Sequence, residues 1–138
     1  MPLPTPKPLP YTVHLADFAS GKDSPTAFLE RCLANVDTFE PTVGAFVHIE
    51  IEKARAAAAA STARWREGRP LSRIDGMPVG IKDLIETADM PTQCGSPVFE
   101  GYQSHRDAAS VVALRQAGAI ILGKTVTTEF AARVPRGT

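Results

Sequence analysis

Apolar residues in the first third of the chain recur at the spacing of a helix that buries one face. Ser24 followed by Pro25 is a favourable helix start, because serine caps free backbone amides and proline fits the first turn. Pro41 cannot continue a helix without losing a hydrogen bond, so we expect the helix to stop there. The positions on the predicted buried face are Phe28, Leu29, Cys32, Leu33, Val36 and Phe39.

A second helix is predicted over residues 50–67, where the sequence reads "KARAAAAASTARWREG" towards its end. Alanine has the highest helix propensity, and a run of alanines lets a neighbouring backbone approach closely. Gly68 and Pro70 follow the run and mark the end of the helix. We interpret Trp65 as a partly buried anchor of this helix rather than as a stacking surface for a ligand.

Short apolar runs in the second half of the chain predict strands. One strand ends at Lys82, in the sequence Val79-Gly80-Ile81-Lys82, and a second occupies the run "AIILGK", residues 119–124. Between them lie a long loop and a helix that Asp107 is expected to cap and Gly118 to end. Strand, crossover helix and strand are typical of a parallel unit. The predicted fold class is therefore α/β, with N-terminal helices followed by a βαβ-type unit of a mixed sheet.

Residues 118–125, "GAIILGKT", satisfy the written pattern of a phosphate-binding loop. That motif needs a strand, then a loop of free backbone amides, then a helix. Here the four intervening residues are apolar and should themselves form the strand, while the preceding residues form a helix. We therefore reject nucleotide binding, and interpret Gly118 as a helix cap and Lys124 as a strand-end cation.

Composition narrows the class of protein. The length of 138 residues suits one domain, and 15 basic residues balance 15 acidic ones, so no overall field favours nucleic acid or an anionic membrane. No apolar run reaches the ~20 residues of a membrane span. Prolines at alternate positions predict a flexible arm over residues 1–12, ahead of a domain over residues 13–138. Two widely separated cysteines without a disulfide pattern favour the cytoplasm.

Lys82 is the residue whose position raises a question of chemistry. The three histidines have no metal-ligand spacing and no serine lies in a Gly-x-Ser-x-Gly elbow, so neither a metal nor another cofactor is expected. Gly80 and Lys82 share one face of the predicted strand, and the glycine would leave room beside the amine. The amine then either reaches water from the strand end, or lies in a dry site where desolvation lets it accept a proton.

The sequence over residues 70–131 resembles the N-terminal part of amidase signature enzymes. The similarity rests on "DGMPVGIKD" followed by "RDAASVVALRQAGAIILGKT", with upstream "SPTAFLERCLANVDTFEPTVGAFV" similar to the first helix and strand of the family. The resemblance implies hydrolysis of a carboxylic amide to carboxylate and ammonia by a serine–lysine mechanism. By the same resemblance Lys82, in Gly80-Ile81-Lys82-Asp83, would be the catalytic base and Asp83 structural. Val126 stands where many members carry asparagine, which suggests a subgroup.

The family's Gly/Ser-rich segment, which supplies the nucleophile, the bridging serine and the oxyanion amides, is not found in these 138 residues. The resemblance therefore implies an incomplete part of the amidase fold from a split or truncated gene. In one hypothesis the chain contributes Lys82 when the missing part binds, and a small amide is then the substrate. In the alternative it is a non-catalytic amidase-derived fragment or assembly partner that associates through an exposed strand edge. We expect the chain alone to be inactive.

Overall fold

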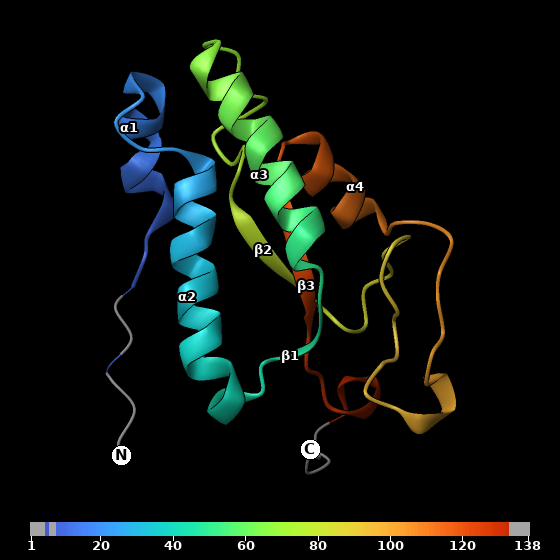
Figure 1. The fold of residues 1–138 in the computed structure, drawn as a ribbon. Coiled ribbons are helices and arrows are strands. Elements are labelled where there is room, and N and C mark those ends of the chain that lie inside the picture. Colours follow the sequence, from blue (N-terminus) through green and yellow to red (C-terminus); the bar gives the residue numbers. More distant parts are fainter. Residues whose placement is uncertain (1–4, 6–7, 133–138) are drawn as a thin grey trace.

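The computed structural model describes residue 5 and residues 8–132, in which helices cover both faces of a small mixed sheet (Figure 1). Strand β3 is central, antiparallel to β1 and parallel to β2, in the order β1-β3-β2. The predicted fold class is confirmed. The elements are η1 (Tyr11–His14), α1 (Leu15–Ser20), α2 (Pro25–Val43), β1 (Phe46–Ile49), α3 (Ile51–Arg66), β2 (Pro78–Lys82), η2 (Pro97–Phe99), α4 (Ala109–Gln116), β3 (Ile120–Thr125) and η3 (Glu129–Ala131).

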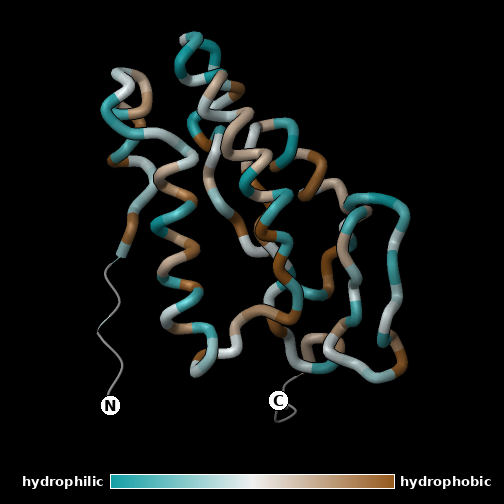
Figure 2. The backbone as a smooth tube through the Cα atoms, in the orientation of Figure 1, coloured by the Kyte–Doolittle hydropathy of each residue, from teal (hydrophilic) through white to brown (hydrophobic). Residues whose placement is uncertain are grey.

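The core has two layers because successive residues of β3 point to opposite faces of the sheet. Ile120 and Leu122 pack under α2 and α3, whereas Ile121 packs on the other face with Val111 of α4 and Ile81 of β2. Figure 2 colours the backbone by hydropathy, and brown, apolar stretches recur along the helices and at the centre of the fold. The apolar run of the rejected phosphate loop is thus a buried strand, as predicted.

Helix α2 begins as predicted and ends later than predicted. The Ser24 hydroxyl accepts a hydrogen bond from the Ala27 amide at 3.1 Å, with Pro25 in the first turn. The expectation that Pro41 stops the helix is wrong, because the helix continues to Val43 and ends at Gly44 in a left-handed conformation. Proline removes only its own amide hydrogen bond in the last turn, and the Gly44 amide still reaches the Glu40 carbonyl at 2.9 Å.

The alanine run of α3 forms a close contact with α2, as the sequence predicts. Ala54 and Ala58 are buried against Leu29 and Leu33 of α2. Trp65 near the end of α3 is partly buried against Phe18, 5.8 Å between ring centroids, and its indole donates to the Asp75 carbonyl at 2.9 Å. Trp65 is therefore an anchor, as interpreted.

The cap of α4 differs from the prediction. Ala108 occupies the cap position without a side-chain hydrogen bond, so Asp107 does not cap this helix. The Asp107 carboxylate instead accepts the Ala88 amide at 2.7 Å, which the preceding loop brings to it, and pairs at 2.9 Å with Arg115 of α4 itself. Gly118 ends α4 at φ +87°, and a Cβ there would lie 2.5 Å from Asp75 Oδ1.

The predicted flexible arm of residues 1–12 falls partly on residues 1–4, 6 and 7, which lie outside the described part. Within the described part, Tyr11 is buried against Phe18 and Phe28, and its hydroxyl donates to the Asp75 carbonyl. The packed structure therefore already includes Tyr11. Burial, followed by the field of Asp75, raises the pKa of the Tyr11 phenol.

Asp75 joins the start of β2 to α3 and to the N-terminal aromatic cluster. It is fully buried, and its carboxylate accepts Arg64 at 2.6 and 2.8 Å and the Leu71 amide at 2.8 Å. Burial alone would raise the pKa of Asp75, but the hydrogen bonds from Arg64 and Leu71 hold it below its ordinary value. The carboxylate is therefore charged and paired in the folded chain.

We predict that Asp75→Asn lowers the free energy of unfolding at neutral pH by about 3 kcal/mol, because Arg64 loses its buried partner. Since the folded pKa of Asp75 lies below the unfolded value of about 3.9, its contribution is present above that pH and is lost as the pH falls through the folded value. Urea unfolding of both proteins between pH 7 and pH 2 measures this. A stability difference that does not shrink with acid would contradict it.

We predict that Ala58→Leu destabilises the chain by about 1–3 kcal/mol, because the added methyl groups must separate α2 from α3. Ala57→Leu makes the same chemical change on the exposed face of α3 and is expected within about 0.5 kcal/mol of the parent. Thermal and urea unfolding of the two variants compare them directly. Equal effects would show that the α2–α3 contact is not closely packed.

Candidate functional site

Lys82 lies where the carboxyl ends of the two parallel strands meet. It is the last residue of β2 and pairs in register with Thr125, the last residue of β3. The Lys82 carbonyl accepts the amides of Leu84 at 2.7 Å and Ile85 at 2.9 Å, which turns the chain away from the sheet. The backbone that carries this amine is therefore fixed on both sides.

The Lys82 side chain is exposed, so the residues described do not form the dry site that the desolvation argument requires. The neighbouring face of β2 follows the predicted alternation, with Ile81 buried and Gly80 exposed. The space at Gly80 is used differently from expectation: a Cβ there would lie 2.7 Å from the Thr125 methyl carbon. This glycine admits a side chain of β3 rather than leaving room for the amine.

The buried lysine of this region is Lys124, for which the sequence predicts a strand-end cation. Lys124 does lie at the carboxyl end of β3, one residue before the last, but its side chain is fully buried, which the sequence did not predict. Its amine donates to the Pro91 carbonyl at 3.0 Å and the Thr92 hydroxyl at 2.7 Å, and lies 3.3 Å from Asp83 Oδ1. Burial lowers the pKa of Lys124, and the nearby Asp83 carboxylate partly opposes this shift.

The amide, the carbonyl and the carboxylate of Asp83 all form hydrogen bonds. Its amide donates to the Thr125 carbonyl at 2.9 Å, which continues the β2–β3 ladder by one residue. Its carboxylate accepts the Gln93 amide at 3.1 and 3.2 Å, and its carbonyl accepts the Cys94 amide at 2.9 Å. These contacts agree with the structural role expected for Asp83.

Residues 93–96 are fastened to the segment that follows β3. The Phe130 amide donates to the Cys94 carbonyl at 2.9 Å, and the Ser96 hydroxyl donates to Glu129 Oε1 at 2.8 Å. Gly95 permits this approach, because a Cβ there would lie 2.6 Å from the Thr127 carbonyl oxygen. Burial, followed by the field of Asp83, raises the pKa of the Cys94 thiol, so this cysteine is not an activated nucleophile.

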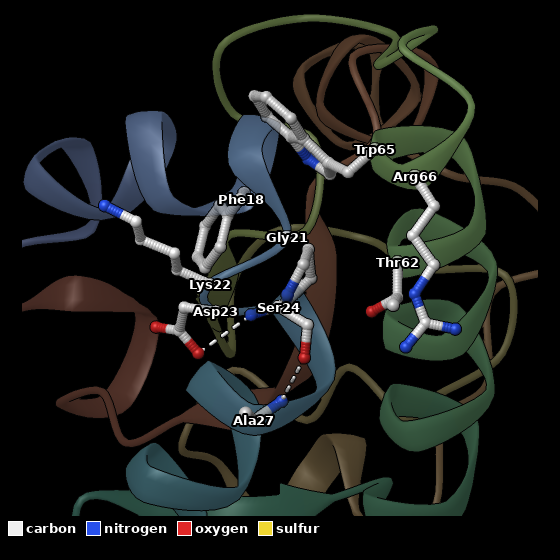
Figure 3. Close-up of a pocket in the computed structure, with 10 residues that line it drawn as sticks. Phe18, Gly21, Lys22, Asp23, Ser24, Ala27, Thr62, Trp65 and Arg66 are labelled. Carbon is white, nitrogen blue, oxygen red and sulfur yellow. Dashed lines mark hydrogen bonds between the residues drawn. The ribbon is translucent and has the colours of Figure 1, made fainter.

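The pocket in Figure 3 lies elsewhere, between the turn that starts α2 and the end of α3, with a volume of about 200 Å³. Its charges are mixed, since Lys22 and Arg66 share it with Asp23. The helix amides that face it are already satisfied, Ala27 by the Ser24 hydroxyl and Thr26 by Thr62. This pocket therefore lies beside the N-terminal cap of α2, and none of its lining residues belongs to the sheet edge that carries Lys82.

Two of the histidines lie beside carboxylates in partly buried pairs. His14 lies 3.3 Å from Asp23, and His48 lies 3.0 Å from Glu50. Within residue 5 and residues 8–132, no three side chains of the metal-ligating types come together as a metal site. The helices in that part of the chain lack the length and apolarity to cross a bilayer.

Known proteins are similar to this chain in sequence and in fold. The family model described as amidase matches residues 27–134. The chain belongs to the amidase signature family. A glutamyl-tRNA(Gln) amidotransferase subunit from Rhodopirellula baltica is 40% identical over 117 residues, which are 85% of this chain and 23% of that protein. The corresponding protein of Mycobacterium bovis is 42% identical over 117 residues, with 84% and 24% covered.

Solved structures of the family share the fold. Native peptide amidase from Stenotrophomonas maltophilia superposes with a TM-score of 0.79 at 29% identity, covering 87% of this chain and 25% of that one. A chain from a vestigial protein complex related to the origins of an s-triazine catabolic enzyme gives 0.81 at 29% identity, covering 88% and 27%. This amidase-family chain thus spans about a quarter of the length of the relatives it matches.

We predict that the stability conferred by Lys124 increases with pH. Because its folded pKa is lowered, the unfolded chain binds more protons between that value and the unfolded pKa of about 10.4, so folding becomes more favourable as the pH rises through this window. Urea unfolding across this pH range gives the free energy of unfolding of the parent minus that of Lys124→Met. The difference for Lys53→Met, at an exposed lysine, is the control. If the difference for Lys124→Met were as independent of pH as the difference for Lys53→Met, the prediction would be wrong.

Proposed function

We propose that this chain carries the general base, Lys82, of a serine–lysine amidase that hydrolyses a carboxylic amide to carboxylate and ammonia. The observation that supports this most directly is the placement of Lys82: an exposed amine on a backbone that the sheet and the following turn hold on both sides. Relatives named as a peptide amidase and as part of an amidotransferase also point to amide chemistry.

The mechanism requires an uncharged Lys82 amine that accepts a proton from a serine hydroxyl through a bridging serine. The hydroxyl oxygen then attacks the amide carbonyl, ammonia leaves with a proton, and water hydrolyses the acyl-enzyme. These 138 residues contain no Gly/Ser-rich segment, so we assign both serines to the part of the family fold that this sequence does not span. The same part of the fold also has to cover the exposed Lys82 amine, because the proposed proton transfer needs a site without bulk water.

A second candidate is a non-catalytic assembly partner. Strand β2 lies at one side of the described sheet, with β3 as its strand neighbour, and an unpaired strand edge is a template for another chain. The relative from a vestigial protein complex makes assembly a reasonable role for a chain of this family. The two candidates differ in what Lys82 does: it is needed for hydrolysis and is dispensable for association.

We also propose a reducing cytoplasmic location. Cys32 and Cys94 are both free thiols and neither is fully exposed. Burial raises the pKa of both, which keeps them protonated and unreactive.

We predict that Lys82→Ala lowers kcat by about 100-fold or more when the chain is combined with the remaining amidase-family polypeptide of the same genome, since loss of a general base costs this much. Lys53→Ala, at another exposed lysine, is the matched control and is expected to keep full activity. Ammonia released from glutamine, benzamide and a dipeptide amide is the measurement. Lys82→Ala with parental kcat would exclude the base, and complex formation without hydrolysis by the parent would favour the assembly role.

A further inference from the structure

The Lys124 amine is unsuited to be a proton acceptor although it is the buried lysine of this edge. An ammonium group has three donors, and Lys124 has three oxygen partners: the Pro91 carbonyl, the Thr92 hydroxyl and the Asp83 carboxylate. Its side chain is fully buried, so no substrate hydroxyl reaches it. Its contacts are those of a group that holds other groups in place.

The partners of Lys124 come from separate segments of the chain. Asp83 follows β2 directly, whereas Pro91 and Thr92 belong to the loop that returns towards the sheet, and Lys124 itself lies in β3. Asp83 also binds this loop directly. Its carboxylate accepts the Gln93 amide and its carbonyl accepts the Cys94 amide. The pair therefore fastens the loop to the ends of both parallel strands.

The position held most directly by this arrangement is that of Lys82. Asp83 is its neighbour in the chain, and the Asp83 amide bonds β3 through the Thr125 carbonyl at 2.9 Å. Lys82 pairs in register with the same Thr125. Movement of Asp83 towards solvent would break the ladder at Thr125 and release the backbone from which the Lys82 side chain extends.

A buried ion pair is seldom more stable than apolar packing of the same volume, so its use here calls for another explanation. We propose that Asp83 and Lys124 are positioning residues, which fix the backbone of Lys82 and the loop of residues 91–94 so that the amine meets its proton donor. This deepens the proposed function and rests on it. Charge-assisted hydrogen bonds are directional, so the three oxygens around the Lys124 amine define the position of the loop. Apolar contacts have no preferred direction and would allow the loop to shift.

Amide hydrogen exchange of the 138-residue chain, read residue by residue by NMR, tests the fastening itself. In Lys124→Met we expect the amides of Gln93 and Cys94 to exchange at least about tenfold faster relative to those of α3, because their acceptor Asp83 loses its cation. Lys22→Met, at an exposed lysine in the turn before α2, is the matched control and should leave the ratio unchanged. A uniform increase over all amides, or none, would overturn the proposal.

If Lys124→Met does not fold, the double variant Asp83→Asn with Lys124→Met replaces it, because it leaves no unpaired charge in the interior. The same ratio of exchange rates decides the outcome. Loss of protection confined to residues 83–94, with α2 and α3 still protected, supports the proposal. Parental protection of residues 83–94 in the double variant would show that the pair does not hold this loop.

The second readout uses the chain combined with the remaining amidase-family polypeptide and the same three amides. We expect Lys124→Met to lower kcat by about 100-fold with KM changed less than about threefold, since a small displacement of a reacting group has this effect. Parental kcat in a folded Lys124→Met protein, with Lys82→Ala inactive, would overturn the positioning role and leave the proposed function standing. An active Lys82→Ala protein would instead refute the proposed function, while the exchange ratios still decide whether the pair holds the loop.

Discussion

Strand β2 lies between two buried carboxylates, and the need to pair each of them constrains the whole arrangement. Asp75 precedes the strand and is paired with Arg64 of α3, while Asp83 follows it and is paired with Lys124 of β3. A buried carboxylate without a partner costs several kcal/mol, so neither cation is free to lie elsewhere. The strand is therefore held at its start against a helix and at its end against the central strand.

The candidate site is a consequence of this constraint. Because β2 and β3 are parallel, their carboxyl ends meet at one edge, and the chain leaves β2 there with Asp83 turned inward and Lys82 outward. The rigid part of the site and its exposed part are thus adjacent residues. The base that we propose needs this combination, since its amine has to reach a hydroxyl while its backbone stays fixed.

Sequence patterns predict the elements well and their ends less well. The helices of residues 25–43 and 51–66 are predictable because their apolar positions recur at helical spacing, and both parallel strands are predictable because each is a short apolar run. The expectations for Pro41 and Asp107 are wrong, since local rules for proline and caps ignore what the last turn or a distant loop supplies. Lys82 and Lys124 look alike in the sequence, each at the end of an apolar run, yet one is exposed and the other buried.

The sequence by itself determined the fold class, the order of the three longer helices and both parallel strands, the rejection of a phosphate loop and the resemblance to the amidase signature family. Local periodicity and short motifs are sufficient for these, because they depend on residues close together in the chain. Only the tertiary structure decided which lysine is enclosed. That depends on the loop of residues 91–94 returning to cover Lys124 and leaving Lys82 open, and a contact across more than 30 residues leaves no periodic trace in the sequence.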